Sequence, residues 1–213
     1  AQNDLIRREA LGSFRKMLHG MAKDVAMLIW LDSNANRKRQ ANENFAREVM
    51  ELFSLGEGNY TEDDIKQAAR AFTGWHVRED KFWFNVRQHD NGTKTLFGKT
   101  GNLDGGEIID LCLGHKACPR FLAFKLLRTF VLDQPTKMQI TALAARIREH
   151  DFAMQPVMRE LFSSRLFFGA EARHAIIKSP LELVLGACRA LVVRPDLQVV
   201  NRITGQLGQA ILE

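Results

Sequence analysis

Apolar residues recur every three or four positions along most of this chain, and that spacing is interrupted once, between residues 76 and 106. A period near 3.6 residues places the apolar side chains along one face of an α-helix. The helices predicted in this way cover residues 5–18, 25–30, 42–55, 61–75, 108–113, 119–132, 136–150, 156–162, 179–193 and 197–212. The short apolar run at 25–30 is expected to be buried. The pattern therefore predicts a mainly α, multi-helical single domain over residues 1–213.

The interruption at residues 76–106 has the pattern of β-structure. Apolar and polar residues alternate from Phe82 to Arg87, which is typical of a strand. Asn91-Gly92 predicts a type I′ turn, after which residues 93–97 would return as a second strand. We therefore predict a small β-hairpin inserted at residues 81–98 and followed by a glycine-rich loop.

The segment Asn42–Trp75 has the clearest helix boundaries. Gly56 is expected to take the left-handed conformation that ends the first of its two helices. Thr61 is expected to cap the second helix, with Asp64 completing a capping box. Because the connection is short, the two helices should form an antiparallel hairpin.

Charged residues gather on the outer face of this predicted helical hairpin. Glu43, Arg47 and Glu51 follow one another at intervals of four residues, which allows ion pairs along the helix. The structural interpretation is an ion-pair network that joins the two helices and consists of Glu43, Arg47, Glu48, Glu51 and Arg70. The alternative is that Glu43, Glu48 and Glu51 bind a divalent cation or supply an acid–base pair. Arg47 disfavours this alternative, because its positive charge opposes a bound cation.

His89-Asp90 is the best candidate for chemistry that involves a histidine. The adjacent pair is similar to part of a metal-hydrolase motif, but no matching set of distant histidines accompanies it. Asp90 is also an ordinary turn residue before Asn91-Gly92. The catalytic candidates are therefore His89, Asp90, Glu48 and Glu51, with no metal-ligand set and no cofactor identified.

The composition limits the classes of partner. The 213 residues carry a net charge of +5, and the one dense basic run, Arg37-Lys38-Arg39, is short for a nucleic-acid site. Nucleic acid is therefore a disfavoured partner. Cys112, Cys118 and Cys188 show no metal-type pairing, so buried free thiols are expected. No window of about 18 apolar residues occurs, so no transmembrane segment is predicted.

Four strings of residues together resemble one known family. They are NENFAREVMELFSLGEGNYTEDDIKQAARAFTGW at 42–75, RQHDNGTKTLFGKTG at 87–101, GEIIDLCLGHKACPRFLAFKLLRTFV at 106–131 and IKSPLELVLGACRAL at 177–191. In order and spacing they resemble the bacterial family known as domain of unknown function 1800. The resemblance covers most of the chain and implies no established activity. It implies a bacterial source and, for many members, export from the cytoplasm.

Members of that family are longer than this chain. They have an additional N-terminal region and a C-terminal stretch with Pro-Pro and Gly-Trp motifs, which this sequence lacks. We therefore expect the chain to be the central part of a longer protein. A site that depends on the other parts would be incomplete here.

Two function hypotheses follow from the sequence. The first is a non-catalytic structural or interaction module of a bacterial protein, with a protein partner whose identity is unknown. The alternative is a metal-dependent or hydrolase-like enzyme that uses His89, Asp90 and the helix face of Glu43, Glu48 and Glu51. The residues themselves indicate no compartment, and export is implied by the resemblance alone.

Overall fold

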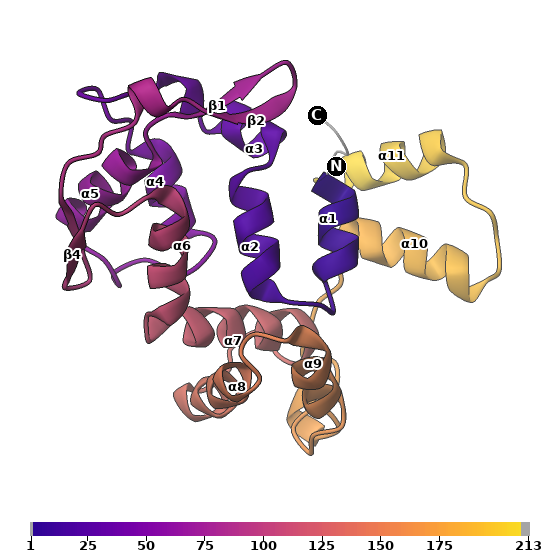
Figure 1. Ribbon diagram of the computed structural model, residues 1–213. Helices are drawn as coiled ribbons and strands as arrows, with labels where there is room; N and C mark the ends of the chain where they lie inside the picture. The colour runs from indigo at the N-terminus through magenta and orange to yellow at the C-terminus, as the bar shows by residue number, and fades with distance from the viewer. Residues whose placement is uncertain (1, 210–213) are drawn as a thin grey trace.

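The computed structural model describes residues 2–209 as a bundle of helices with two small β-hairpins (Figure 1). Its α-helices are α1 (Gln2–Glu9), α2 (Phe14–Ala22), α3 (Val25–Trp30), α4 (Asn44–Glu51), α5 (Glu62–Phe72), α6 (Gly105–Gly114), α7 (Ala117–Phe130), α8 (Lys137–Glu149), α9 (Met154–Phe162), α10 (Pro180–Ala190) and α11 (Leu197–Gln206). Its strands are β1 (Trp75–Arg78), β2 (Lys81–Phe84), β3 (Lys94–Leu96) and β4 (Lys99–Gly101), and its 3₁₀ turns are η1 (Ser33–Ala35), η2 (Val86–Gln88) and η3 (Ala170–Ala172). The predicted mainly α class with a β insertion is confirmed.

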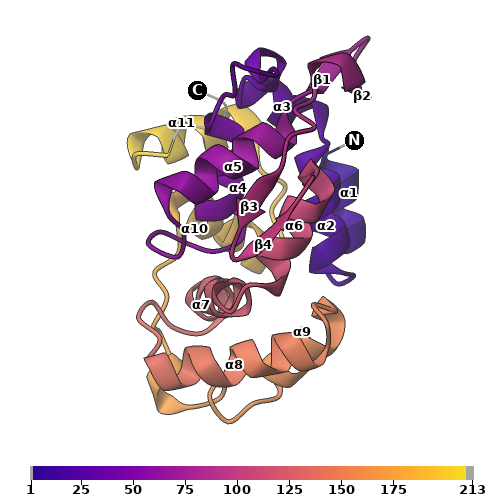
Figure 2. The ribbon, with the colours of Figure 1, turned by 60° about the vertical axis from the view of Figure 1, so that its left-hand side comes forward.

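The hydrophobic core lies where α5 contacts α4, α6 and β3. Phe45 of α4, Phe72 of α5 and Trp75 of β1 pack ring against ring, with neighbouring centroids 4.9 and 5.2 Å apart. Below this core, α7 lies between the α4–α6 region and the α8–α9 pair (Figure 2). The predicted helical hairpin of α4 and α5 is therefore the centre of the domain.

Local capping signals predicted the starts of α5 and α10 correctly, although α5 ends at Phe72, and Trp75, predicted at the end of that helix, begins β1. Thr61 and Asp64 form the expected capping box at the start of α5, and Ser179 and Glu182 form another at the start of α10. Gly56 has φ of +78°, as expected for a left-handed residue after a helix. These contacts join residues only three positions apart, so the local sequence is enough to specify them.

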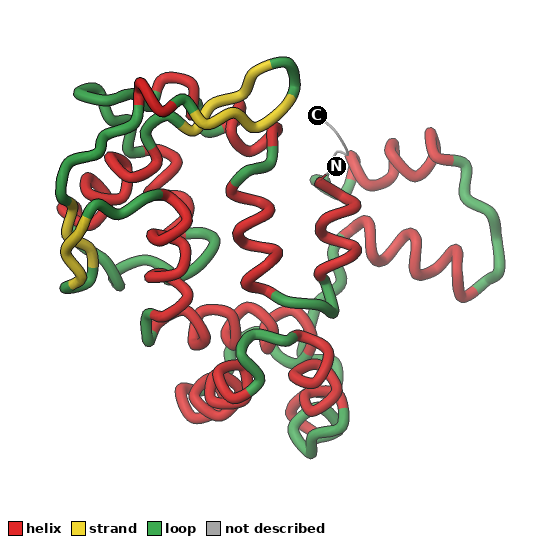
Figure 3. The backbone as a smooth tube through the Cα atoms, in the orientation of Figure 1, coloured by secondary structure: helices red, strands yellow, loops and turns green. Residues whose placement is uncertain are grey.

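The predicted strand pairing is wrong. The strand at Lys81–Phe84 pairs with Trp75–Arg78, and the strand at residues 94–96 pairs with residues 99–101 (Figure 3). Each hairpin closes through two residues with positive φ, namely Glu79-Asp80 at 51° and 54° and Phe97-Gly98 at 48° and 81°. Positive φ at both loop positions is the geometry of a type I′ turn. Glu79-Asp80 was missed because it contains no glycine or asparagine.

The helix predicted at 5–18 is also wrong, because the chain forms two helices there. The segment between α1 and α2 is held by strand-like contacts with the loop before α9. The Phe14 amide donates to the Phe152 carbonyl at 3.0 Å, and the Met154 amide donates to the Gly12 carbonyl at 2.7 Å. Ser13 then caps α2. A partner about 140 residues away along the chain therefore interrupts a helical pattern.

The apolar run in α3 is less buried than predicted. Leu28 is buried, but Trp30 is 83% exposed and Ile29 is 60% exposed. Leu52, the residue that follows α4, is half exposed as well. The six residues of α3 make fewer than two turns, so only one of its faces can contact the core.

Adding a methyl group at Gly105 should destabilise the fold. A Cβ at the first residue of α6 would lie 2.5 Å from Cζ2 of Trp75 and 2.6 Å from Cδ1 of Phe72. We expect Gly105→Ala to lower the free energy of unfolding by about 1–3 kcal/mol in a denaturant titration. Gly114→Ala is the matched control in the same helix, because a Cβ there meets open space. The control should be neutral or stabilising by up to about 1 kcal/mol, and equal losses in both variants would contradict the packing argument.

Candidate functional site

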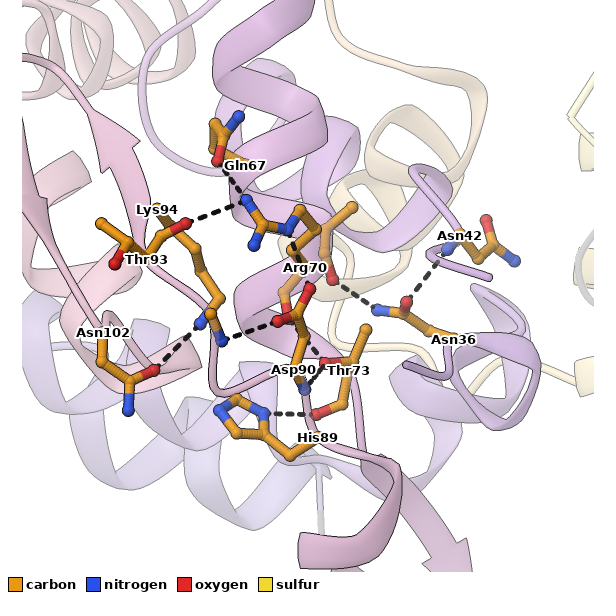
Figure 4. Close-up of polar contacts among 12 residues, drawn as sticks. Asn36, Asn42, Gln67, Arg70, Thr73, His89, Asp90, Thr93, Lys94 and Asn102 are labelled. Carbon is orange, nitrogen blue, oxygen red and sulfur yellow. Dashed lines mark hydrogen bonds and ion pairs between the residues drawn. The ribbon is translucent and has the colours of Figure 1, made fainter. Parts of the chain in front are cut away.

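Two of the candidate residues meet at the end of α5, where the β insertion contacts the helices (Figure 4). Nε of Arg70 donates to a carboxylate oxygen of Asp90 at 2.8 Å. Nη1 of Arg70 donates to the Gln67 side chain at 2.8 Å and to the Thr93 carbonyl at 3.1 Å. One guanidinium group therefore joins α5 to both sides of the loop between β2 and β3.

The Asp90 carboxylate is held in place by its own loop as well as by Arg70. Its other oxygen accepts a hydrogen bond from the Gly92 amide at 2.8 Å, and the Asp90 amide donates to Oγ1 of Thr73 at 2.8 Å. The Arg70 hydrogen bond, aided by the Gly92 amide, holds the pKa of Asp90 below its usual range. Asp90 is therefore ionised at neutral pH, and each of its carboxylate oxygens already accepts a hydrogen bond.

His89 is buried beneath the same loop. Only 5% of its surface is exposed, and Nδ1 donates to the Thr73 carbonyl at 2.8 Å. Because a carbonyl oxygen only accepts, this contact places a proton on Nδ1. The Phe84 ring lies 5.2 Å from the imidazole in an edge-to-face arrangement. His89 thus lies at an anchor point between the loop and the end of α5.

Two residues of this cluster were not singled out from the sequence. Lys94 of β3 is 1% exposed, and its Nζ donates to Oδ1 of Asn102 at 3.3 Å. Burial lowers the pKa of Lys94. Asn36, also buried, donates to the Ala69 carbonyl at 3.0 Å and accepts from the Asn42 amide at 2.9 Å. The signal for Lys94 is its spacing, since it shares one strand face with buried Leu96.

The carboxylates of α4 belong to a separate cluster. Arg47 pairs with Glu43 at 3.3 Å and binds both carboxylate oxygens of Glu62, at 2.7 and 2.9 Å. The hydrogen bond with Glu62 is the largest cause of the raised pKa of Arg47, and the same hydrogen bond lowers the pKa of Glu62. Glu51 accepts from the Tyr60 hydroxyl at 2.5 Å. Burial and this hydrogen bond raise the pKa of Tyr60 to about 12.

The structure therefore keeps the two groups of candidates apart. Within residues 2–209, Arg70 pairs with Asp90 rather than with Glu48 or Glu51, and Glu48 has no side-chain hydrogen bond or ion pair. Glu62 is the first residue of α5 and Arg70 is the ninth, so the two clusters lie roughly 12 Å apart along the helix. In the described part of the chain, no group of three or more His, Cys, Asp or Glu residues is arranged to hold a metal ion.

Cys112 and Cys118 are buried and Cys188 is half-buried, and all three are free thiols. Burial raises the pKa of Cys112 and of Cys118 to about 12, which keeps both in the unreactive thiol form. Each helix between residues 2 and 209 is too short or too polar to span a bilayer.

These features define a class of protein: a helical domain whose β insertion is fastened by buried polar side chains. The chain belongs to the family described as "Protein of unknown function (DUF1800)", whose model matches residues 1–213, the whole chain. The resemblance seen in the sequence is thus confirmed. No curated protein and no solved structure matches the chain significantly.

Removing the charge of Asp90 should weaken the fold at neutral pH. The Asp90 side chain is 19% exposed, so we expect Asp90→Asn to lower the free energy of unfolding by about 1–3 kcal/mol near pH 7. A carboxylate whose folded pKa is depressed stabilises the fold above its unfolded pKa, roughly 3.9. That stabilisation disappears as the pH falls through the lower folded pKa, so the difference between the two proteins should shrink in acid. Denaturant titrations from neutral to acidic pH would measure it.

An exposed ion pair supplies the control for this experiment. Asp133 pairs with Arg128 at 2.9 Å, but its side chain is 61% exposed. Asp133→Asn should cost at most about 1 kcal/mol, because solvent screens the pair. A loss for Asp90→Asn that equals the control, or that does not change with pH, would contradict the structural role of the Arg70–Asp90 pair.

Proposed function

We propose that this domain is a non-catalytic interaction module that binds another protein through the helical hairpin of α10 and α11. The observation that carries the proposal is the apolar surface of that hairpin, whose two helices pack mainly against each other (Figure 1). No residue of α10 is buried, and Val192 is 91% exposed. The other exposed large apolar residues of the hairpin include Leu183, Leu191, Val193, Leu197 and Leu207. An apolar surface of this kind is typical of a protein-binding site.

The charges around the apolar residues indicate the chemistry of the partner. The hairpin and its connections carry exposed basic side chains at Arg173, Lys178, Arg189, Arg194 and Arg202. Its two acidic residues cap helices, since Glu182 accepts from the Ser179 amide and Asp196 accepts from the Gln198 amide. A second copy of this chain would bring like charges together. The better partner is therefore an apolar helical surface with a rim of carboxylates.

The two polar clusters support a structural rather than a catalytic role for the candidate residues. Asp90 and His89 are occupied by contacts with Arg70, Gly92 and Thr73. Arg47 joins α4 to α5 through Glu62. We propose that these groups stabilise the framework that presents the α10–α11 hairpin, as buried or half-buried ion pairs of defined geometry can do.

The alternative enzyme would need His89 as a metal ligand or proton carrier. If that alternative held, His89→Ala would lower the metal content of the purified protein, measured by elemental analysis. We expect His89→Ala to leave the metal content unchanged and to reduce thermal stability, because the buried Thr73 carbonyl loses its donor. A stoichiometric metal that is lost in His89→Ala would contradict the non-catalytic proposal.

Designed helical peptides test the interaction directly. An amphipathic peptide with leucines on one face and glutamates at the edges should bind the protein, as measured by fluorescence anisotropy. Its affinity should fall at least about tenfold for Leu191→Glu, because a charge then enters the apolar surface. A peptide with lysines in place of the glutamates should bind at least about tenfold more weakly.

Met138→Glu is the matched control variant. Met138 is 79% exposed on α8, away from the hairpin, so its substitution should leave peptide binding unchanged. Equal binding of the two peptides, equal effects of Leu191→Glu and Met138→Glu, or the absence of saturable binding would overturn the proposal.

A further inference from the structure

A second surface, unrelated to the α10–α11 hairpin, lies on the β1–β2 hairpin (Figure 1). His76 pairs with Trp83 and Arg78 pairs with Lys81 across the two strands. Directly opposed residues share one face of an antiparallel pair, so these four side chains form one face that carries an imidazole, a guanidinium, an ammonium group and an indole. The other face carries Trp75 and Phe82 into the core, with ring centroids 5.3 Å apart.

A groove of about 550 Å³ runs beside this face. Its lining includes the cationic residues Arg78 and Arg87, the indole of Trp83 and the amides of Asn85 and Gln88, and it includes no carboxylate. Arg87 forms no ion pair within residues 2–209, and Arg78 has only a solvent-exposed pair with Glu79, at 3.6 Å. The volume is in the range of small-ligand sites, and the charge favours an anion.

Trp83 is placed to contact a flat ring. Its side chain keeps 40% of its surface exposed, and the guanidinium carbon of Arg78 lies 5.4 Å from the ring centroid. The His76 ring lies 6.2 Å from the indole on the same strand face. An aromatic side chain beside arginines can stack on a heteroaromatic ring while the arginines bind its phosphate.

Three buried side-chain atoms of the described residues have no hydrogen-bond partner, and one of them belongs to a residue that lines the groove. They are Oγ of Ser33, Nε2 of His76 and Oε1 of Gln88, each buried without a hydrogen-bond partner. Ser33 and His76 are 2% and 6% exposed. Buried polar groups are nearly always paired in folded proteins, and of these three residues Gln88 lines the groove, so its amide oxygen is available to a polar ligand there.

Two hydrogen bonds join the three segments that carry these atoms to one another or to a neighbouring segment. The Val77 amide donates to Oδ1 of Asn34 at 2.9 Å, which connects β1 with η1. The Lys38 amide donates to the Gln88 carbonyl at 2.8 Å, which connects the basic run at residues 37–39 with η2. The basic run at residues 37–39 is thus next to the groove and adds positive charge on that side.

We propose that this groove binds a nucleotide-class ligand, in which a flat heteroaromatic ring contacts Trp83 and a phosphate group binds Arg78 and Arg87. A mononucleotide fits better than a nucleic-acid strand, because the hairpin turn next to the groove carries Glu79 and Asp80. These carboxylates would repel the phosphates that follow along a strand. The two arginines of the groove then bind a single phosphate group.

Isothermal titration calorimetry with adenosine monophosphate tests the proposal on the intact chain. We expect saturable binding with a dissociation constant below about 1 mM. Inorganic phosphate and adenosine should each bind at least about tenfold more weakly, because each lacks half of the contacts. If phosphate alone bound as tightly as the nucleotide, Trp83 would have no role and the proposed ligand class would be wrong.

Variants distinguish the groove from general electrostatic attraction. Arg87→Ala and Trp83→Ala should each weaken binding at least about tenfold, whereas Trp83→Phe should retain most of it because a ring remains. Arg159→Ala removes one exposed positive charge on α9 and should have no effect. Circular dichroism should show that all four variants remain folded, as expected for exposed positions.

Three results would overturn the proposal. The first is an absence of saturable binding, and the second is an equal loss of affinity in Arg159→Ala and Arg87→Ala. The third is tighter binding of oligothymidylate than of the mononucleotide, with a steep dependence on salt in every variant, which would indicate a non-specific polyanion surface. Failure of this test leaves the proposed role of the α10–α11 hairpin unaffected, because the two surfaces share no residue.

Discussion

The contact of the Arg70 guanidinium with Asp90 and the Thr93 carbonyl is the interaction on which the arrangement of the insertion depends. Residues 85–93 contain few large apolar side chains, so hydrophobic burial alone cannot dock this loop on the helices. Polar contacts with Thr73 and Arg70 do so instead. Because these partners lie at the end of α5, the position of the loop follows the position of that helix. The two β-hairpins on either side of the loop are then placed relative to the core.

The same requirement explains why charge is concentrated at the two ends of α5. At its start, Glu62 binds Arg47 of α4, and at its last turn Arg70 binds Asp90 of the loop. Between them the helix is apolar and buried at Ile65, Ala68 and Ala69. Apolar packing thus stabilises α5 in the core, and the ion pairs at its two ends determine which segments contact the helix there. Clustered carboxylates and histidines in a sequence therefore need not mark a reaction.

The two proposed binding surfaces share a physical feature that the ion-pair clusters lack: groups that remain unsatisfied. On the α10–α11 hairpin these are apolar side chains such as Val192 that stay in water. In the groove they are the amide oxygen of Gln88 and the guanidinium of Arg87, which forms no ion pair within residues 2–209. Both conditions cost free energy in the isolated chain, and a ligand of matching chemistry relieves each. By contrast, Asp90 and His89 have their contacts already.

The sequence by itself determined the features that depend on neighbours a few positions away. These are the helical class, the capping boxes at Thr61 and Ser179, the left-handed Gly56 and the family membership. Only the tertiary structure decided that Arg70 pairs with Asp90, that Phe152 and Met154 divide the first predicted helix, and which strands pair. The reason is that a cap or a helical face is specified by contacts within one or two turns. The partner of a long side chain or of a short strand is chosen among distant segments, whose proximity exists only once the core has formed.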